Sequence, residues 1–284
     1  MRTSFILIFT IFIFPLYSQS PSIKSFTDGL TKKEGFINYY WDEEKGKLYL
    51  EIEKLDKELI YINYLAAGVG SNDIGLDRGQ IGGTRIIKFI KMGPKILMVQ
   101  PNYKFRAVSE NQEEIKSVED AFAKSTIWGF AIKASSNDKF IVDATEFSMR
   151  DSHMVSARLK RQNQGTFKID QKSSSFDAVS SKNFPFNTEI ESFLTFRGMA
   201  TGRWLSSVSP NSESFSVRTR HSFVQLPDEG YSPRKFDPRA GYGAMTFYDY
   251  ASPIEDDLHI KYIRRHRLIK KYPNSIYSTR SQRI

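Results

Sequence analysis

The sequence contains no cysteine among its 284 residues, so it can form no disulfide and offers no thiolate nucleophile. A lipoprotein anchor is excluded for the same reason, because that anchor needs a cysteine at the cleavage site. Stability must therefore come from ordinary core packing. A chain of this length can bury a substantial core in one large domain or two small ones.

Long hydrophobic runs are also absent. The most apolar stretch, residues 5–16, follows Arg2 and precedes the small polar residues 18–20, which is the pattern of a secretory signal peptide. This stretch is too short to span a membrane as a stable helix. We therefore expect residues 1–20 to be removed and the protein to be exported to the periplasm or the medium, with no membrane association after cleavage.

An excess of one charge is missing from most of the chain. The net charge is +9, but residues 258–284 carry eight basic and no acidic residues, which leaves 33 basic against 32 acidic residues elsewhere. Because the rest of the chain carries nearly equal numbers of basic and acidic residues, we do not expect it to bind nucleic acid. The basic segment is either a solvated strand and tail or a docking surface for an acidic partner. Its candidate docking residues are Arg264, Arg265, His266 and Arg267.

The motifs that commonly carry catalysis are missing too. The four histidines belong to no HExxH pattern, the spacing that places two imidazoles on one zinc ion and a glutamate on its water. No GxSxG elbow occurs either. We therefore expect no catalytic residue, no metal ligand and no cofactor in this chain. A spatial pairing of His221 with His266 on a metal is the alternative that spacing alone leaves open.

Glycine, in contrast, is abundant in one segment. Residues 65–85 contain six glycines around Asp73, Asp77 and Arg78, between two strand-like runs. Such a cluster predicts backbone in conformations that other residues avoid, or a close approach by another surface. A dinucleotide fingerprint fails because Asp73 stands in place of its third glycine, and no GK[ST] follows for a phosphate loop.

Two interpretations of this glycine-rich loop remain. Asn72, Asp73 and Asp77 could supply oxygen ligands for calcium, although the spacing and the closing glutamate of an EF-hand are missing. Asp and Asn beside Gly are also ordinary turn residues, which favours a purely structural loop. The residues predicted to form an interface or structural surface are Gly70, Asn72, Asp73, Asp77, Arg78 and Gln80.

Alternation and turn signals predict a mainly β fold of the α+β type. The short links favour antiparallel, sandwich-like sheets. Residues 47–53 alternate as a half-buried strand does. The predicted strands are 36–41, 47–53, 59–65, 84–91, 95–100, 126–133, 140–144, 166–170, 188–196 and 213–225.

Two helices interrupt the strands. The first follows a capping box of Ser109 with Gln112 and places Ile115, Val118 and Phe122 on one apolar face, suited to lying on a sheet. The second is basic and covers residues 152–162. We predict one domain over residues 21–271, with an alternative boundary near 170, and a short basic tail at 272–284.

Long strings carry a more specific signal. NYLAAGVGSNDIGLDRGQIGGTRIIKF, ENQEEIKSVEDAFAKSTIWGF and RHSFVQLPDEGYSPRKFDPRAGY, in this order, resemble the N-terminal region of a family of large exported bacterial zinc-dependent metalloproteases. The resemblance covers about residues 35–271. It implies that this region, a domain of unknown function, precedes a metzincin-like catalytic domain that carries HExxHxxGxxH. This sequence contains no counterpart of that catalytic region. The resemblance places zinc only in the catalytic region.

The resemblance implies a non-catalytic N-terminal domain, inactive by itself, in a truncated or split family member. Its partner would be a metalloprotease catalytic domain, in cis or encoded by an adjacent gene, faced by the glycine-rich loop and the basic segment. The alternative is a free-standing exported β-domain that binds peptide or glycan on aromatic strands. The aromatic residues concerned are Tyr39, Tyr40, Trp41 and Tyr49, for which core packing is the favoured interpretation.

Overall fold

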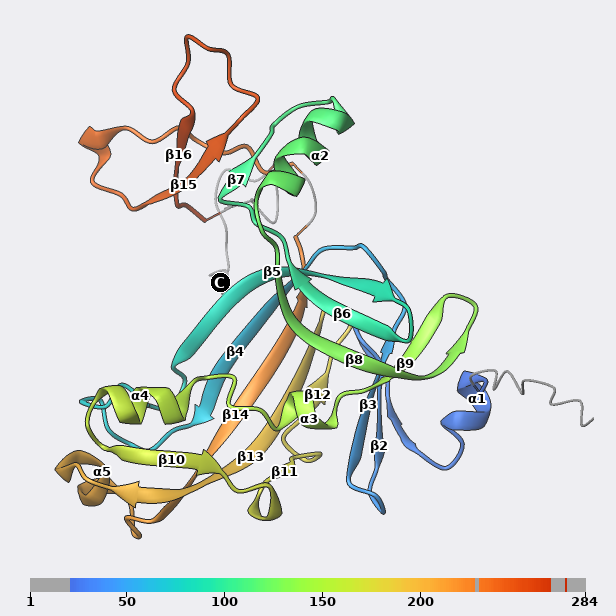
Figure 1. Ribbon diagram of the computed structural model, residues 1–284, viewed down its shortest axis with the longest axis vertical. Coiled ribbons are helices and arrows are strands. Elements are labelled where there is room, and N and C mark those ends of the chain that lie inside the picture. Colours follow the sequence, from blue (N-terminus) through green and yellow to red (C-terminus); the bar gives the residue numbers. More distant parts are fainter. Residues whose placement is uncertain (1–20, 228–229, 267–273, 275–284) are drawn as a thin grey trace, which may run out of the picture.

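The computed structural model describes residues 21–227, 230–266 and residue 274. Within them the chain forms one large antiparallel sheet and one small three-stranded sheet, with short helices between the strands (Figure 1). The predicted mainly β, antiparallel fold is confirmed. The predicted signal peptide at 1–20, Arg267 and almost all of the predicted tail at 272–284 lie outside the described residues.

The large sheet contains strands from both halves of the chain. In the order in which neighbours pair, it is built from β1 (Thr31–Lys33), β2 (Tyr39–Asp42), β3 (Lys47–Ile52), β9 (Lys139–Asp143), β8 (Ser125–Ser136), β6 (Lys95–Gln100), β5 (Ile81–Met92), β4 (Leu59–Ala67), β14 (Ser214–Gln225), β13 (Asn187–Ala200) and β10 (Gly165–Ile169). Two short strands, β11 (Ser175–Phe176) and β12 (Lys182–Asn183), also pair with β13. All ten predicted strands are present, with ends displaced by up to four residues.

The large sheet bends until its two ends meet. The N–H of Phe36, just before β2, donates to the carbonyl of Phe184 at 2.8 Å. The N–H of Ile37 donates to Thr188 Oγ1 at 2.9 Å. Trp41 of β2 packs against Phe176 of β11, with ring centroids 4.8 Å apart. One continuous sheet therefore encloses the core.

The enclosed face carries two apolar clusters. Strand β4 alternates, and its buried residues Leu59, Tyr61, Asn63 and Leu65 face this interior. The first cluster is rich in phenylalanine and the second is built partly from the loop after β4. Each large apolar side chain that is fully buried contributes about 2 kcal/mol to folding.

Strand β3 departs from the expected half-buried pattern because both of its faces are covered. Leu48 and Leu50 lie in the first apolar cluster, whereas Tyr49 packs on the opposite face. There the short helix α1 (Ile23–Phe26) closes over the sheet, and Phe26 meets Tyr49 edge to face at 5.1 Å between ring centroids. The prediction of a solvated face on residues 47–53 is therefore wrong.

Helix α2 (Gln112–Ala121) is the predicted amphipathic helix, and Val118 is its buried residue. Its N-cap differs from the prediction, because Asn111 and not Ser109 accepts a backbone N–H of the first turn, that of Glu113 at 3.0 Å. Ser109 instead accepts the N–H of Asn111. The helix packs beside the small sheet and not on the large one (Figure 1).

The second predicted helix is present as α4 (Val155–Arg161), three residues shorter at its start. The Asp151 carboxylate accepts the N–H groups of Val155 at 2.7 Å and Ser156 at 2.9 Å, which fixes where the helix begins. The shorter elements, none of them predicted, are α3 (Thr145–Ser148), α5 (Arg203–Val208), and the 3₁₀ turns η1 (Gln171–Ser173) and η2 (Pro238–Ala240).

The small sheet is also new relative to the sequence analysis. It consists of β16 (His259–Ile263), β15 (Ala244–Asp249) and β7 (Phe105–Arg106), and β7 runs parallel to β15. Phe105 stacks on Phe122, beyond α2, with ring centroids 4.0 Å apart. In Figure 1 this sheet and α2 form a unit that projects from the large sheet. We call α2, β7, β15 and β16 the projecting unit.

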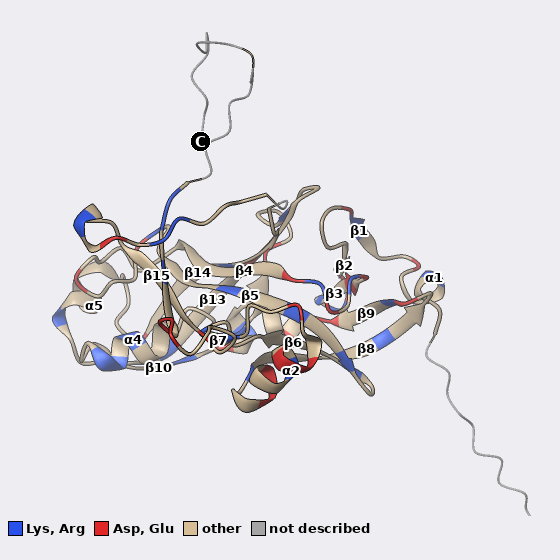
Figure 2. Cartoon of the chain, turned by 90° about the horizontal axis from the view of Figure 1, so that it is seen from above, with Lys and Arg blue, Asp and Glu red and all other residues tan. Residues whose placement is uncertain are grey.

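Charge is distributed unevenly over these elements. Figure 2 shows that acidic residues are concentrated on α2 and basic residues on α4. Among the described residues, no helix has both the length and the apolar character needed to cross a membrane.

Candidate functional site

The glycine-rich loop is compact and anchored in the core. After β4 the chain turns back on itself, with Val69 N–H donating to the Leu76 carbonyl at 2.9 Å and Gly75 N–H to the Asn72 carbonyl at 2.9 Å. Ile74 and Leu76 are fully buried in the second apolar cluster. The loop is therefore held by its own apolar residues as well as by turn chemistry.

The six loop residues nominated from sequence do not form one site. Asn72 and Asp77 meet: with its amide turned so that Nδ2 faces Asp77, Asn72 donates to both carboxylate oxygens at 2.9 and 2.8 Å. Asp73 and Arg78 are exposed. Within the described residues, no three His, Asp or Glu side chains lie close enough together to hold a metal ion.

Two of the nominated residues help to shape the backbone of the loop. Gly70 has φ of +82°, a conformation that residues with a Cβ rarely adopt. Gln80 returns the loop to β5, where its carbonyl accepts the Leu65 N–H at 3.0 Å, and its side-chain oxygen Oε1 is buried without a partner.

Other glycines mark close approaches, as predicted, but the approaching surface belongs to the same chain. A Cβ on Gly68 would lie 2.0 Å from the Leu76 carbonyl oxygen. A Cβ on Gly82 would lie 2.3 Å from Asn63 Nδ2 and 2.7 Å from His153 Nδ1. At Gly83 a Cβ would lie 2.5 Å from Arg85 Nη1.

These contacts lead to a polar cluster inside the bent sheet. Register pairing places Arg85 of β5 beside Tyr61 of β4, and His221 of β14 beside Asn63 of β4. The segment from α3 to α4 covers them with further polar groups. We call this set of residues the inner polar cluster. Its members are Tyr61, Asn63, Arg85, Arg150, His153 and His221.

A chain of hydrogen bonds fixes one side of the inner polar cluster. Arg150 Nη2 donates to the Tyr61 hydroxyl at 3.0 Å, and that hydroxyl lies 2.7 Å from His221 Nδ1. His221 Nε2 lies 3.2 Å from the Ser148 carbonyl, which can only accept. The proton of His221 is therefore on Nε2, and Nδ1 accepts from Tyr61.

Burial keeps His221 neutral. It lowers the pKa of this imidazole to about 3, and the nearby Arg150 charge acts in the same direction. Both ring nitrogens are engaged with protein groups, so a metal shared by His221 and His266 finds no support in this geometry. His221 is a structural histidine.

The other side of the inner polar cluster is less completely bonded. Arg85 Nη1 donates to Asn63 Oδ1 at 3.1 Å, and Asn63 Nδ2 donates to the Ser152 carbonyl at 2.9 Å. Arg150 Nε, Ser152 Oγ and His153 Nδ1 are buried and have no partner. Burial also lowers the pKa of His153 below its ordinary value.

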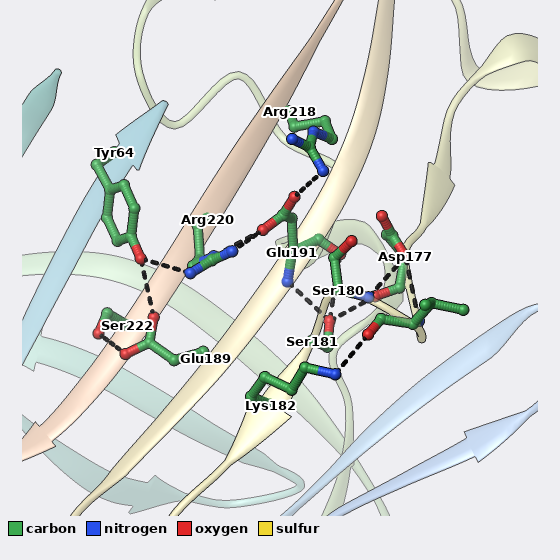
Figure 3. Close-up of polar contacts among 11 residues, drawn as sticks. Tyr64, Asp177, Ser180, Ser181, Lys182, Glu189, Glu191, Arg218, Arg220 and Ser222 are labelled. Carbon is green, nitrogen blue, oxygen red and sulfur yellow. Dashed lines mark hydrogen bonds and ion pairs between the residues drawn. The ribbon is translucent and has the colours of Figure 1, made fainter. Parts of the chain in front are cut away.

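A second charged cluster lies on the opposite face of the same strands (Figure 3). Glu191 is fully buried, and Arg220 Nε donates to its Oε2 at 2.7 Å while Arg218 Nη1 lies 3.2 Å from its Oε1. Arg220 also donates to the Tyr64 hydroxyl at 3.0 Å, and Tyr64 in turn donates to Glu189. We call this the outer ionic network. Both of its arginines have a carboxylate partner, and its contacts tie β4, β13 and β14 together.

A cavity lies where the ends of the bent sheet meet. Its volume is about 540 Å³, and apolar side chains make up much of its lining, among them Phe36, Leu59 and Phe89. Next to its lining residue Pro185, Phe184 and Phe186 are exposed, Phe186 by 67%. This is an ordinary size and character for a ligand pocket.

The basic docking residues begin where β16 ends. Arg264, Arg265 and His266 are exposed. Arg265 Nη2 donates to the Ser232 carbonyl at 2.7 Å, and its guanidinium lies 5.6 Å from the ring centre of Tyr231. Arg264 N–H donates to the Gly243 carbonyl, which places this residue beside the start of β15.

The aromatic platform is not present. Tyr39, Tyr40 and Tyr49 are buried, and Trp41 packs on Phe176. The favoured interpretation of these residues as core is confirmed. Sequence reasoning missed the inner polar cluster, although the adjacent glycines at 82 and 83 were its visible signal.

Comparison with known families agrees with the extent of the fold. Residues 79–271 match a family described as a domain of unknown function, DUF5117, and residues 20–68 match the domain of unknown function DUF5118. The first match covers more than half of the chain, so the protein belongs to the DUF5117 family. No curated protein and no solved structure matches the chain. The expected domain of unknown function is thus confirmed, and the metalloprotease context stays a hypothesis.

The two matched segments are not separate in space. Strand β4, within the DUF5118 match, pairs with β5 and β14, both within the DUF5117 match. The sheet also continues across residue 170, since β10 and β13 pair along their length.

Proposed function

We propose that this protein is the non-catalytic N-terminal domain of an exported zinc-dependent metalloprotease and that it docks or supports a catalytic domain. The resemblance of its strings to that family's N-terminal region is what supports this context. The observation that carries the docking role is the surface of the projecting unit.

That surface combines exposed apolar side chains with positive charge. Tyr242 and Met245 are exposed by 65% and 56%, at the start of β15. Arg264 and Arg265 follow β16, which pairs with β15. We call Tyr242, Met245, Arg264 and Arg265 the docking surface. Exposed aromatic, Met and Arg side chains are enriched in protein interfaces, and the charge suits an acidic face on the partner.

Binding in trans tests this role. The full chain would be titrated with a separately purified catalytic domain of the metalloprotease family, and we expect saturable binding. The paired change Tyr242→Ser with Met245→Ser should weaken it at least tenfold. The matched control is Val179→Ser with Met199→Ser, which alters equally exposed apolar residues elsewhere. Absence of binding, or an equal effect of both pairs, contradicts the proposal.

The non-catalytic part of the proposal has its own test. Purified protein is incubated with zinc and unfolded casein, and we expect no fragments above those of a protein-free blank. Cleavage that a chelator abolishes would overturn it.

A second candidate function is peptide or glycan binding, which the cavity of about 540 Å³ and its exposed neighbours Phe184 and Phe186 favour. Tryptophan fluorescence would be followed across peptide and oligosaccharide panels. Saturable quenching that Phe186→Ala weakens supports this candidate, and flat titrations across both panels remove it.

A further inference from the structure

Two arginines of the inner polar cluster lack the partner that their charge calls for. Among the described residues, neither Arg85 nor Arg150 has a carboxylate within salt-bridge distance. Each donates one hydrogen bond, to Asn63 and Tyr61 respectively, although a guanidinium has five N–H groups. The outer ionic network offers the contrast, since Arg218 and Arg220 share Glu191 there.

The two arginines lie beside the same tyrosine. Arg85 pairs with Tyr61 across β5 and β4, and Arg150 donates to the Tyr61 hydroxyl. Burial raises the pKa of Tyr61, while the charges of Arg150 and Arg85 both act to lower it, which puts both arginines within electrostatic range of this hydroxyl. Two half-buried cations in one cluster repel each other and are stabilised by an anion between or beside them.

The surrounding groups are arranged to hold these side chains. The Arg150 guanidinium lies 4.8 Å from the ring centre of Phe147, which fixes its plane and leaves Nε unpartnered. The Arg85 guanidinium lies against Gly83, where any Cβ would displace it. His153 Nδ1 is a further unpartnered polar atom of this cluster, on a side chain that is more than nine-tenths buried.

Arg85 belongs both to the inner polar cluster and to the lining of a cavity of about 380 Å³. This cavity is mainly polar and has Lys104 as its second cation. No Asp or Glu is among the described residues that line it. A cavity lined by two cationic residues and by no acidic one favours a negatively charged ligand.

We propose that Arg85 and Arg150 form a binding site for an oxyanion, a carboxylate or phosphate group, which enters through the cavity lined by Arg85 and Lys104. The planar guanidinium forks complement two oxygens of such a group. None of the site's residues belongs to the docking surface, so the site is tested separately from the proposed docking role.

Calorimetric titration at constant ionic strength tests the site and its source of anion. One arm uses inorganic phosphate; the other uses an acetylated tetra-alanine peptide with a free C-terminal carboxylate, against its C-terminal amide. Saturable binding of phosphate, of the free-acid peptide, or of both supports the site and identifies the source. Failure of both ligands to bind overturns it.

Variants assign the binding to the two arginines. Arg85→Met and Arg150→Met keep an unbranched apolar stem without the charge, and each should weaken binding at least tenfold. Arg239→Met, at an exposed arginine that pairs with Asp237, is the control and should leave the dissociation constant unchanged. Unchanged binding in both cluster variants overturns the proposal.

A measurement on the wild-type chain covers the case in which a variant fails to fold. Phenylglyoxal modifies accessible arginines, and peptide mapping by mass spectrometry reports each one. The bound ligand should slow the modification of Arg85 at least threefold and leave that of Arg239 unchanged. Equal rates at Arg85 with and without ligand contradict the proposal.

Discussion

At the scale of single residues, the roles of several polar groups in this protein are determined by the residues around them and not by their own chemistry. His221 is an example: from sequence it could be a metal ligand, whereas the structure buries it between Tyr61 and the Ser148 carbonyl. Sequence cannot reveal this, because the contacts come from three segments far apart in the chain. Its neutral state has a measurable consequence for stability.

We expect His221 to make folding depend on pH. Its folded pKa of about 3 lies below the ordinary value of 6.5, so between these values the unfolded state binds more protons. The stability that neutral His221 contributes to the folded state is therefore fully present above about pH 6.5 and is lost as the pH falls toward 3. Relative to His221→Gln, which cannot titrate, the wild type should lose about 2–3 kcal/mol of unfolding free energy between pH 7 and 4.5. Urea denaturation at each pH measures this, and parallel curves would show that His221 does not titrate as described.

The glycines of residues 65–85 are residue-scale features that sequence does predict. Gly68→Ala would place a Cβ 2.0 Å from the Leu76 carbonyl oxygen, a backbone atom that cannot move aside cheaply. We expect a loss of about 1–3 kcal/mol in unfolding free energy. Gly243→Ala, where nothing lies within 4 Å of the new Cβ, is the control and should change stability by less than about 0.5 kcal/mol. Similar losses in both variants would mean that the close approach at Gly68 is not what matters.

At the scale of elements, alternation found the long strands and missed the short pieces. Strand β14 is easily predicted from the sequence, because its more buried and more exposed positions alternate over much of its length. The sequence of β3 was misleading, because Tyr49 and Glu51 look like solvated positions. In the fold, α1 covers Tyr49, while Tyr40 and Lys139 contact Glu51. The start of α4 was misplaced for a similar reason, since its cap comes from Asp151, four residues before the helix.

Removing that cap should destabilise the segment that covers the inner polar cluster. Asp151→Ala deletes both acceptors for the N–H groups of Val155 and Ser156, which we expect to cost about 1–2 kcal/mol. Hydrogen exchange at these two amides should accelerate accordingly. Asp28→Ala, at an exposed turn residue, is the control and should leave both amides unaffected. Unchanged exchange in Asp151→Ala would show that other contacts fix the start of α4.

At the scale of the whole molecule, the sheet order could not be read from the sequence. The neighbours β4 and β14 are separated by more than a hundred residues, and nothing local encodes their pairing. This pairing places the residues that match DUF5118 and those that match DUF5117 in one hydrogen-bonded sheet. The inner polar cluster also depends on it, because His221 reaches Tyr61 only across this junction.

Because the junction is shared, we expect the two matched segments to unfold as one unit. The three tryptophans allow a direct comparison, since Trp41 lies in the first segment and Trp128 in the second. One variant retains only Trp41 (Trp128→Phe, Trp204→Phe) and another only Trp128 (Trp41→Phe, Trp204→Phe). Within each variant, fluorescence and far-UV circular dichroism should give the same urea midpoint, as expected for a cooperative two-state transition. If the Trp41 signal is lost at a lower urea concentration than the circular dichroism of the same variant, the first segment is a separate folding unit and the shared sheet does not couple the two.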